Sequence, residues 1–543
     1  MFFWVRNRVG WFGPCASIGR MLTRLKRIWN WTRTHPVVLG ALLGALYFLL
    51  QMSFLNEYGV TWDEPLHRNW GKLFLIFIRT GDRRFLDLMA GHGIYYSPLY
   101  FFFNYILSEY LYKSGWLAFV PANHVLNLFT ASFAASCLFV LAKKIGGLKT
   151  GLMAVLTLIF FPMFLAHSHY NPKDIPLMSA VLLTATVFIY GLYSGRRGQI
   201  ILAAGLYGVA IALKISALSL APVFALAYLV WAVKQWRTAA GNPHRLKREL
   251  ITVFLSLIAV SAGLYAAWPT AWGAPDLIPN AIRFFLSVQY WPGEVLFFGK
   301  EYSGVALPWY YIPLEYLMAT PILILLAFGT GCAVAVRKVF HRDRAAVFLF
   351  LLLWFWLPIL ASMKPGLVRY DGMRQFFFCL PALAILGGIG VSGWFEWLDR
   401  KFPAKRWLVP VASCLMLGQL LHEVIIIHPF EGSYRNEIVR MFIPRDIDRQ
   451  LQIEFWGEPY KQGMDWLLAN AEPNPFICVP TADVLVTWYP WRPDFSFECS
   501  KRTNYVMFIT RYSEIHKFDH LPIPPVFTIS RYNSALLKIY KIQ

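Results

Sequence analysis

Charged residues are scarce in this sequence. Asp, Glu, Lys and Arg together make up 15% of its 543 residues, whereas a soluble domain carries about 25%. Hydrophobic residues make up 57%, and the mean hydropathy is +0.46. This shortage of charge over so long a chain excludes a cytosolic enzyme with one large core, a coiled coil and a disordered tail. The composition predicts a polytopic membrane protein.

Cysteine is also rare, and several familiar catalytic motifs are missing. Seven cysteines in 543 residues do not form a disulfide framework. The sequence contains no P-loop, GxSxG or HExxH motif. It has no internal repeat with a period of about 20–50 residues. Small disulfide scaffolds, P-loop enzymes, the common serine and zinc hydrolases and solenoids are therefore excluded.

Acidic residues are the scarcer of the two charge types, with 30 Asp and Glu against 51 Lys and Arg and a net charge of +21. The first 36 residues contain no acid, and Lys and Arg recur in alternate loops between the hydrophobic runs. By the positive-inside rule, these loops and the N-terminus are cytoplasmic. No cleaved signal peptide is expected. The basic excess is thus a signal of topology, and nucleic acid is not an expected partner.

Hydrophobic runs of about 18 residues or more are long enough to cross a bilayer as helices. Eleven such spans are expected, near 37–55, 121–142, 150–166, 174–193, 199–213, 215–233, 250–268, 310–336, 345–362, 376–394 and 407–427. The fold class is therefore an α-helical polytopic membrane protein with about eleven transmembrane helices, multi-pass in the inner (plasma) membrane.

The chain divides into three expected parts. Residues 1–36 form a basic cytoplasmic N-terminus, and 37–427 form the transmembrane body. From 428 to 543 acids, Pro and Asn return together with short strand-like runs such as VLVTWYP at 484–490. Because this tail follows an odd number of spans, we expect it to be a small periplasmic α+β domain.

The long external loop at 56–120 contains two further apolar segments. Residues 66–79 are interrupted by basic residues, and 95–112 are interrupted by Asn104 and Glu109. Counting 95–112 as a span would invert every later loop against the charge rule. Both segments are therefore predicted to be helices at the external surface, the second interfacial or re-entrant.

The first candidate site is the acidic pair Asp63 and Glu64, just after the first span. A carboxylate at the mouth of an apolar body can act as a general base if its pKa keeps it ionised. The structural alternative is that Asp63, which is followed by Glu64 and Pro65, caps a helix beginning there. The residues alone leave both readings open.

The second candidate site is the stretch HSHYNPKD at 167–174. His167 and His169 are weak candidates for ligands of a divalent metal. Lys173 and Asp174 could hold a phosphate and a carboxylate partner. The alternative is a solvated turn in which Asp174 caps the next helix. The sequence does not require a cofactor, and a divalent metal stays open.

The remaining candidates are basic residues beside hydrophobic runs. Lys214, inside AIALKISALSLAP, either snorkels to the interface or reaches a buried anion. Arg369 and Arg374 lie in a short external loop that the positive-inside rule would leave poor in cations. Arginine binds phosphate with a planar pair of donors, and anionic lipid headgroups are the alternative ligand. The set predicts a carboxylate for deprotonation and cations for a phosphate leaving group.

Four stretches in this order resemble a known group of enzymes. They are TWDE at 61–64, NPKDIP at 171–176, RYDGMRQFFFCLPALAILGG at 369–388, and HPFEGSYRNE with EFWGEPYKQGMDWL at 428–467. Together they resemble the type C membrane glycosyltransferases, in the superfamily of protein O-mannosyltransferases and the lipid A aminoarabinose transferase. The similarity is closest to bacterial phospholipid-carrier-dependent glycosyltransferases and covers roughly residues 40–470.

The resemblance implies a GT-C-type fold and a set of catalytic carboxylates. Asp63 matches the carboxylate that activates the acceptor. Glu64 is its neighbour, which helps to hold the acceptor or a metal. Asp174 matches the second acidic position of the family.

The resemblance also implies which residues bind the phosphate of the donor. Lys173 matches the cation beside the second acid, and Lys214 resembles a lysine that meets the carrier phosphate. Arg369 and Arg374 fall in the late loop that contacts the same phosphate. Gln375 departs from the pattern, because the family often has His there. Residues 471–543 match nothing in the family.

These observations predict an inverting glycosyltransferase with a periplasmic site. It would move a sugar from a polyprenyl-phosphate donor to an acceptor that is a lipid, a glycan or a protein. The alternatives are a secondary transporter or flippase for a lipid-linked sugar or another anion, and a lipid-binding subunit without catalysis. A transporter is disfavoured because the polar clusters lie at helix ends and no paired halves are visible.

Two cysteines of the tail raise a separate question. Cys478 and Cys499 are the only cysteines after residue 428. In a periplasmic domain they could form a bridge, or they could be two buried thiols too far apart to join. The sequence leaves this choice open.

Overall fold

The computed structural model describes residues 31–542 apart from 33, 90–92, 239–242, 275, 288–290, 292, 343, 406 and 521. The predicted basic N-terminus at 1–36 therefore lies almost entirely outside the described residues. So does Arg406 of the loop predicted at 396–406.

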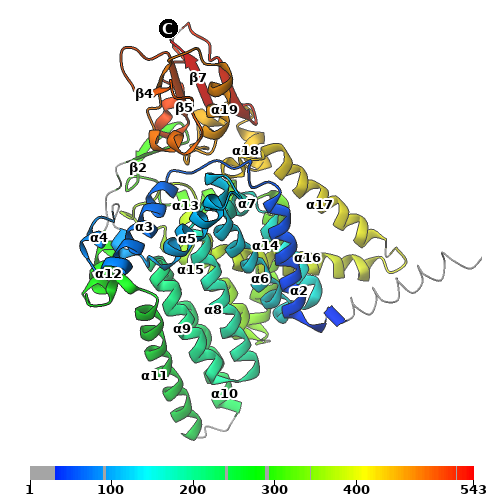
Figure 1. The fold of residues 1–543 in the computed structure, drawn as a ribbon. Helices are drawn as coiled ribbons and strands as arrows, with labels where there is room; N and C mark the ends of the chain where they lie inside the picture. Colours follow the sequence, from blue (N-terminus) through cyan, green and yellow to red (C-terminus); the bar gives the residue numbers. More distant parts are fainter. Residues whose placement is uncertain are drawn as a thin grey trace, which may run out of the picture.

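A bundle of helices stands below a small domain made of the C-terminal tail (Figure 1). The main helices of the bundle are α2 (Pro36–Met52), α6 (Phe119–Ile159), α8 (Asp174–Ser194), α9 (Arg197–Leu213), α10 (Ala221–Thr238), α11 (Pro243–Ala266), α14 (Ile322–Phe340), α15 (Ala345–Ala361), α16 (Leu380–Lys401) and α17 (Leu408–Ile427). Among the described residues, seven helical segments are long and apolar enough to cross a membrane, and α2, α9 and α15 are shorter apolar helices. The prediction of a mostly helical membrane protein is confirmed, and the count of eleven spans stays a prediction.

Two predicted span boundaries are wrong. The run predicted at 150–166 is split between the end of α6 and the short helix α7 (Pro162–Tyr170). The run predicted at 310–336 contains α13 (Tyr311–Met318) and α14, which begins after Pro321. Proline has no backbone N–H to continue a helix, and hydropathy alone does not detect such a break. Within α6, Gly147 has φ 89°, a conformation that favours glycine, and it separates the two predicted spans.

The two predicted surface helices are present. Helix α3 (Glu64–Thr80) packs on α5 (Leu99–Lys113), and the short helix α4 (Arg84–Asp87) follows α3. The rings of Trp70 and Phe101 meet edge to face between them, with centroids 5.2 Å apart. Arg68 of α3 pairs with Glu109 of α5. One charge from each apolar segment is thus neutralised where the helices meet.

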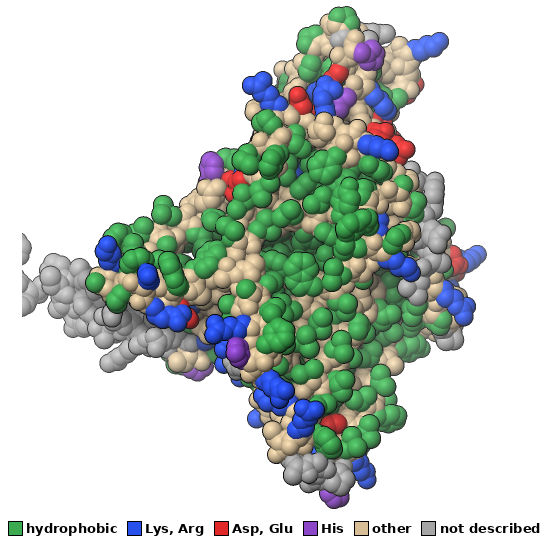
Figure 2. Space-filling model, turned by 180° about the vertical axis from the view of Figure 1, so that it is seen from behind, with side chains coloured by type: hydrophobic (Ala, Val, Ile, Leu, Met, Phe, Trp, Pro, Cys, Tyr) green, Lys and Arg blue, Asp and Glu red, His purple; other side chains and the backbone are tan. Residues whose placement is uncertain are grey.

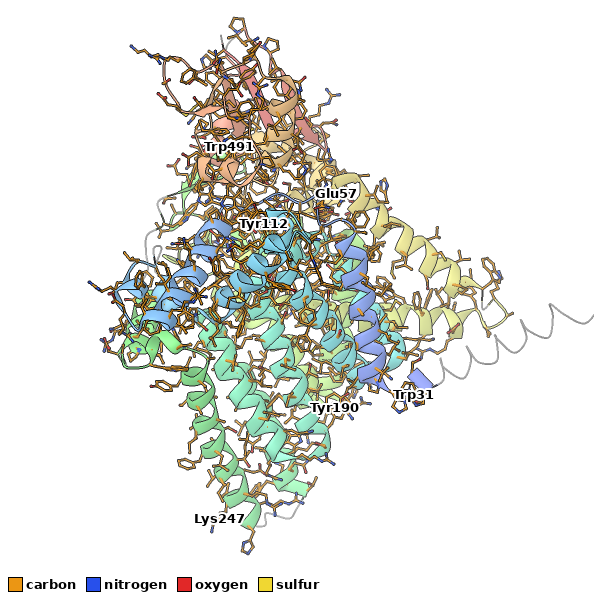
Figure 3. The ribbon with its side chains drawn as sticks, viewed as in Figure 1. Trp31, Glu57, Tyr112, Tyr190, Lys247 and Trp491 are labelled. Atoms are coloured by element: carbon orange, nitrogen blue, oxygen red, sulfur yellow. A yellow bond between two sulfur atoms is a disulfide. The ribbon has the colours of Figure 1, made fainter. Side chains whose placement is uncertain are left out.

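The two ends of the bundle differ in the way that the loop alternation predicts. Lys247, from a loop predicted to be cytoplasmic, lies at the end away from the tail, whereas Glu57, from the loop at 56–120, lies beside the tail (Figure 3). Hydrophobic side chains cover the middle of the face shown in Figure 2. Only 6% of the apolar window of α11 is buried, against 89% for the segment that contains α16. Helix α16 is therefore a core helix, and α11 presents apolar side chains outward, as lipid contact requires.

The tail contains a five-stranded sheet in the order β4-β3-β5-β7-β6. The strands are β3 (Phe476–Cys478), β4 (Ser496–Phe497), β5 (Tyr505–Ile509), β6 (Phe527–Arg531) and β7 (Ser534–Lys541), and α19 (Tyr460–Asn470) precedes them. Pairing is parallel among β4, β3 and β5 and antiparallel among β5, β7 and β6. This small mixed domain agrees with the α+β prediction for the tail.

One strand predicted in the tail is wrong. The run at 484–490 lies largely in a 3-10 helix, η7 (Asp483–Trp488), since a short apolar run does not by itself distinguish strand from helix. The choice left open for the two cysteines is answered, because Cys478 and Cys499 form a disulfide with Cα atoms 4.5 Å apart.

The segment between α11 and α13 was not assigned any structure from sequence. It forms α12 (Leu277–Ser287) and a hairpin of β1 (Glu294–Phe297) and β2 (Lys300–Ser303). Phe297 makes a bridge to Leu451 at the start of the tail. The hairpin thus contacts both the tail, through Leu451, and helix α13, through Tyr311.

Candidate active site

Five of the predicted site residues form one ionic cluster. The Lys214 ammonium lies 2.5 Å from Asp174 Oδ1, and the Lys173 ammonium lies 3.6 Å from Asp63 Oδ2. Arg374 Nη1 lies 3.5 Å from Asp63 Oδ2 and 3.5 Å from Asp174 Oδ2. These residues come from four separate stretches of sequence, and the fold brings them together at the end of the bundle that faces the tail (Figure 1).

Asp63 does not serve as a helix cap. It stands at the N-cap position of α3, but its side chain makes no capping hydrogen bond. Glu64 Oε1 instead accepts hydrogen bonds from the backbone N–H of Thr61 at 2.8 Å and from the Thr61 hydroxyl at 3.0 Å, which ties the turn before α3 to the first residue of the helix. The structural alternative for Asp63 is thereby removed, and its carboxylate is free to face Lys173 and Arg374.

Glu64 is buried and fully committed within the protein. Its Oε2 accepts a hydrogen bond from Asn123 at 2.8 Å and lies 3.0 Å from His124 Nε2. With 1% of its side chain exposed, it has no open edge toward an acceptor. These contacts favour a role for Glu64 in holding the turn that presents Asp63.

Asp174 is likewise not the cap of its helix. Asn171 performs that task, because its Oδ1 accepts hydrogen bonds from the backbone N–H groups of Lys173 and Asp174. Asn171 also donates to Asp174 Oδ2 at 3.0 Å. The turn at 171–174 therefore fixes Asp174 against Lys214, which sits in an extended break between α9 and the 3-10 helix η2 (Ile215–Leu220).

The two arginines of the late loop have different surroundings. Arg369 donates to the backbone carbonyls of Ser362 at 2.8 Å, Leu307 at 3.0 Å and Lys364. Arg374 instead contacts carboxylates, and its closest one is Asp371, with Nη2 to Oδ2 at 2.6 Å. The contacts of Arg369 are those of a residue that holds the loop, while Arg374 belongs to the ionic cluster.

Asp371 is a member of the cluster that sequence reasoning missed. It is 3% exposed and has φ 54°, a left-handed conformation that Asp adopts more readily than most residues. The only sequence signal was its place in the stretch RYDGMRQ, between the two arginines. Trp456 also donates to Asp371, at 3.4 Å, and its ring lies 4.6 Å beneath the Arg374 guanidinium.

Exposure separates the carboxylates of the cluster. The side chain of Asp63 is 24% exposed, whereas those of Asp174 and Asp371 are 1% and 3% exposed. A molecule that enters the site therefore reaches Asp63 first. The other two carboxylates hold cations in place from behind.

The electrostatics of Asp63 follow from the same contacts. Burial alone would raise the pKa of Asp63, but Lys173 and Arg374 outweigh burial and hold the pKa below its usual range. Burial, with the help of Lys173, lowers the pKa of nearby His67 to about 3, so this imidazole is neutral. The site thus presents an ionised carboxylate beside cations at neutral pH.

The two histidines proposed as weak metal ligands do not come together. They lie two residues apart on α7. The His167 ring packs on Phe377 and Trp456, and its Nδ1 is 2.9 Å from Asn171 Nδ2. The His169 ring stacks on Tyr58, with centroids 3.7 Å apart. Across the part of the chain that the structure describes, no group of three His, Cys, Asp or Glu side chains could hold a metal ion.

A second acidic cluster, also missed from sequence, contacts the backbone of Trp456. Glu454 Oε1 accepts hydrogen bonds from the backbone N–H groups of Trp456 at 2.7 Å and Gly457 at 2.5 Å. Tyr170 donates to Glu458, whose Oε2 is buried without a hydrogen-bond partner. Burial raises the pKa of Glu454 to about 7, and burial together with Glu454 raises the pKa of Glu458 well above its usual value.

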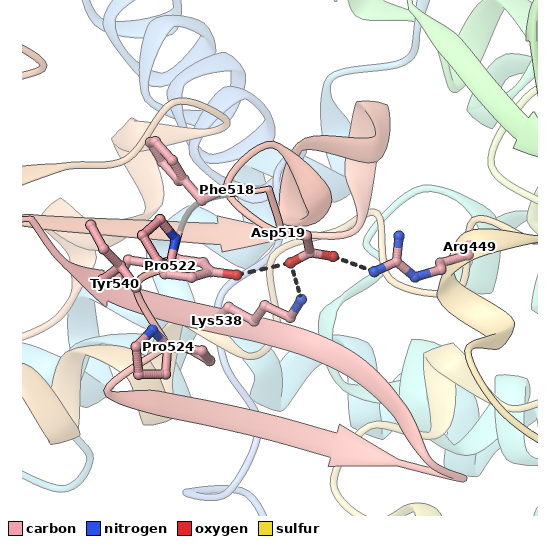
Figure 4. A pocket seen from close by; sticks show the side chains of 9 residues that line it. Arg449, Phe518, Asp519, Pro522, Pro524, Lys538 and Tyr540 are labelled. Carbon is pink, nitrogen blue, oxygen red and sulfur yellow. Dashed lines mark hydrogen bonds and ion pairs between the residues drawn. The ribbon is translucent and has the colours of Figure 1, made fainter.

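A pocket on the tail does not involve these residues. It encloses about 480 Å³ and is lined by Arg449, Phe518, Asp519, Pro522, Ile523, Pro524, Pro525, Lys538 and Tyr540. Its carboxylate, Asp519, already accepts hydrogen bonds from Lys538 at 2.8 Å and Tyr540 at 3.0 Å (Figure 4). We therefore place the candidate active site at the ionic cluster and not in this pocket.

Comparisons with known proteins give a likeness in structure only. A scan against protein-family models and a search of curated proteins find no match. Among solved structures, apo ArnT from Cupriavidus metallidurans is 13% identical, with 93% of this chain and 98% of that chain covered and a TM-score of 0.48. The same protein bound to undecaprenyl phosphate is 12% identical, with 93% and 97% covered and a TM-score of 0.45.

The oligosaccharyltransferase of Archaeoglobus fulgidus in its apo form is also similar. It is 12% identical, with 83% of this chain and 62% of that chain covered and a TM-score of 0.46. At TM-scores below 0.5 we base no conclusion about function on this likeness. The function proposed below rests on the residues of this chain.

Proposed function

We propose that the protein is an inverting glycosyltransferase that uses a polyprenyl-phosphate sugar as donor. The observation that carries the proposal is the placement of one accessible, ionised carboxylate, Asp63, directly beside the cations of Lys173 and Arg374. A base for an acceptor hydroxyl and a binding site for an anionic leaving group are the two parts that such a reaction needs.

The reaction is a single displacement at the anomeric carbon. The acceptor oxygen attacks this carbon, and its proton passes to Asp63. The bond from the anomeric carbon to the phosphate oxygen breaks on the opposite face, and its electron pair leaves with the lipid phosphate. Lys173, Lys214 and Arg374 stabilise the charge of that phosphate. Arg369 is assigned to holding the loop, because its donors are used by backbone carbonyls.

Donor binding would also activate the base. In the free protein, Lys173 and Arg374 lower the pKa of Asp63 and so weaken it as a proton acceptor. A bound phosphate neutralises part of this positive field, which raises the pKa of Asp63 toward the range in which a base is effective. The carboxylate therefore becomes a stronger base once the donor is in place.

The site is proposed to face the periplasm of an inner membrane, with the N-terminus in the cytoplasm. The disulfide between Cys478 and Cys499 supports this placement of the tail, since disulfides persist in oxidising compartments. A nucleotide-sugar donor, which is made in the cytoplasm, is disfavoured on the same ground. The acceptor is a lipid, a glycan or a protein on the external face.

Labelling in cells tests this topology. In a background without free cysteines, Asn470→Cys in the tail should react with a membrane-impermeant maleimide in intact spheroplasts. Lys247→Cys at the opposite end of the bundle is the matched control (Figure 3), because both residues are exposed. It should react only after lysis. The reverse pattern would overturn the placement of every site loop.

Consumption of the donor tests the function. Purified protein is incubated with a panel of polyprenyl-phosphate sugars and a membrane extract as acceptor, and the lipids are separated by thin-layer chromatography. The wild type should consume one donor and release the lipid phosphate, and Asp63→Asn should not. Movement of an intact donor across the bilayer of proteoliposomes, without its consumption, would favour the flippase alternative.

A further inference from the structure

The tail inserts one arginine into the candidate active site. Arg511 begins the 3-10 helix η8 (Arg511–His516), which follows strand β5 of the tail sheet. It is 6% exposed, although it belongs to the part of the chain that matches no motif of the family. Such burial of a charged side chain requires partners, and Arg511 finds them in the helical body and in the first segment of the tail.

The contacts of Arg511 lead directly to the ionic cluster. Its Nη1 lies 3.2 Å from Asp371 Oδ1 and donates to the Phe455 carbonyl at 2.6 Å. The guanidinium lies 4.7 Å from the centre of the Trp62 ring, next to Asp63, and 5.4 Å from that of Trp291. Arg511 therefore contacts the loop that carries Asp371, the Trp62 ring next to Asp63, and the backbone of the tail itself.

Asp371 stands between two arginines. Its Oδ1 faces Arg511, and its Oδ2 accepts two hydrogen bonds from Arg374, at 2.6 Å and 3.1 Å. Arg374 in turn reaches Asp63 and Asp174 through its Nη1. Without Arg511, Asp371 would lose one of its two cationic partners, and Asp371 would draw Arg374 more strongly toward itself.

The backbone around Arg511 is held in an uncommon conformation. Tyr512 and Ser513 have φ values of 58° and 52°, a left-handed conformation that is unfavourable for non-glycine residues. The Tyr512 ring meets the Trp62 ring edge to face, with centroids 6.4 Å apart. This conformation is maintained by contacts to the residue adjacent to Asp63, which ties the turn of the tail to the site.

We propose that Arg511 is a positioning residue of the candidate active site, which holds Asp371 so that Arg374 stays directed at Asp63 and Asp174. The tail is then a structural part of the catalytic centre and not an appended domain. This inference deepens the function proposed above and rests on it for its effect on catalysis, but its effect on Asp63 is measurable without any substrate.

The first test measures the protonation of Asp63 in the full-length protein. Asp63 faces Lys173, Arg374, His67 and Arg511. Reaction with a water-soluble carbodiimide, to which the protonated carboxyl group adds through its oxygen, is followed at Asp63 by mass spectrometry as a function of pH. In Arg511→Met the labelling midpoint should move to higher pH, because one cation is lost and Arg374 is drawn away. Arg511→Lys should restore part of the shift, because the charge returns without the planar fork.

The matched control is Arg531→Met. Arg531 is also a tail arginine that donates to a backbone carbonyl, that of His428 at 2.8 Å, and lies 5.0 Å from the centre of the Phe430 ring. No contact joins Arg531 to Asp371 in the described structure. Its substitution should leave the Asp63 midpoint at the wild-type value. An equal shift in both variants, or no shift in Arg511→Met, would overturn the proposal.

Transfer kinetics give the second test. In Arg511→Met, kcat should fall on the order of 10- to 100-fold through misplacement of Arg374, with a smaller change in KM for the donor. If Arg511 acts through Asp371, the double variant Asp371→Asn/Arg511→Met should be no slower than Asp371→Asn alone. Losses that simply multiply would refute this route. If labelling shifts as expected but the wild type consumes no donor, the positioning role stands and the proposed function fails.

Discussion

Trp456 contacts two buried acidic clusters, through its indole N–H to Asp371 and through its backbone N–H to Glu454, and the chemistry of the two clusters is opposite. In the first cluster Asp63, Asp174 and Asp371 are surrounded by cations, and their carboxylates make ion pairs. In the second cluster the strongest charged influences on Glu458 are the carboxylates of other glutamates. The first cluster carries negative charge inside the protein. In the second cluster the carboxyl groups hold protons and are neutral.

The difference shows that the partner, and not burial, decides the state of a carboxyl group. Burial acts to raise the pKa in both clusters. Lys173 and Arg374 reverse that effect at Asp63, whereas nothing of comparable strength reverses it at Glu458. A cluster of the first kind can bind an anion and accept a proton. A cluster of the second kind contributes packing and neutral hydrogen bonds.

The largest effect is expected when Asp63 is neutralised. Asp63→Asn should reduce transfer on the order of 10²- to 10⁴-fold, which is the usual contribution of a general base. The thermal unfolding midpoint should fall only modestly, because Lys173 and Arg374 each lose one ion-pair partner while no capping hydrogen bond is broken. Initial rates with the donor that the wild type consumes in the panel, together with the thermal unfolding midpoint, check both parts.

Asp82→Asn is the control for this substitution. Asp82 lies in the same long loop but pairs with Arg84, at 2.6 Å, away from the cluster. It should retain full activity. Activity of Asp63→Asn within about threefold of the wild type would remove Asp63 from the role of base.

A smaller effect is expected when Arg374, the cation that contacts both Asp63 and Asp174, is removed. Arg374→Ala should weaken use of the donor by about 1–3 kcal/mol, as for the loss of charge-assisted hydrogen bonds to a phosphate. Arg374→Lys should recover only part of this, because the planar fork is lost. Donor KM and inhibition by polyprenyl phosphate are the measurements.

Arg369→Ala is the matched variant from the same loop. Because Arg369 binds backbone carbonyls, its loss should lower the unfolding midpoint and leave inhibition by polyprenyl phosphate unchanged in the protein that remains folded. Equal weakening of inhibition in Arg369→Ala and Arg374→Ala would mean that both arginines bind the phosphate, as the sequence resemblance implied.

The smallest effect is expected in the second acidic cluster, which contains Glu454 and Glu458. The folded-state pKa of Glu458 is raised by burial and by Glu454, so folding above an unfolded pKa of about 4.3 requires uptake of a proton. Stability should therefore fall as pH rises from about 4.5 to 7.

Glu458→Gln should raise the unfolding midpoint at pH 7 and leave it unchanged near pH 4.5. Asp371→Asn should lower it at pH 7, since it breaks ion pairs with Arg374 and Arg511. A loss in Glu458→Gln as large as that in Asp371→Asn would show that both groups are ionised.

The helical part of the fold was largely predictable from the sequence, because a bilayer imposes one strong signal. Long apolar runs must become helices when no water is present to satisfy the backbone. The helices predicted at 66–79 and 95–112 were also found, as α3 and α5, since their charges break the hydropathy signal. The errors arose where hydropathy does not determine the structure. Pro321 breaks an apolar run that was predicted to be one helix. The short apolar run at 484–490 was predicted to be a strand and forms mostly a 3-10 helix.

The candidate site was predicted in part for a related reason. Asp63, Lys173, Asp174 and Lys214 are charges at the ends of apolar runs, where a charge is costly and therefore informative. Glu454 and Arg511 were not found, because a charged residue in a soluble segment is ordinary. Only the fold shows that the tail brings them beside Trp456 and Asp371.

Binding of a polyprenyl phosphate without sugar tests the central claim most directly, since it requires neither the right sugar nor the acceptor. Undecaprenyl phosphate is titrated into purified protein in nanodiscs, with undecaprenol as the uncharged control. The wild type should bind the phosphate and not the alcohol, and Arg374→Ala should bind it more weakly while Arg531→Met binds it as the wild type does. Equal binding of phosphate and alcohol, or unchanged binding in Arg374→Ala, would contradict the assignment of the cation-rich cluster as the donor-phosphate site.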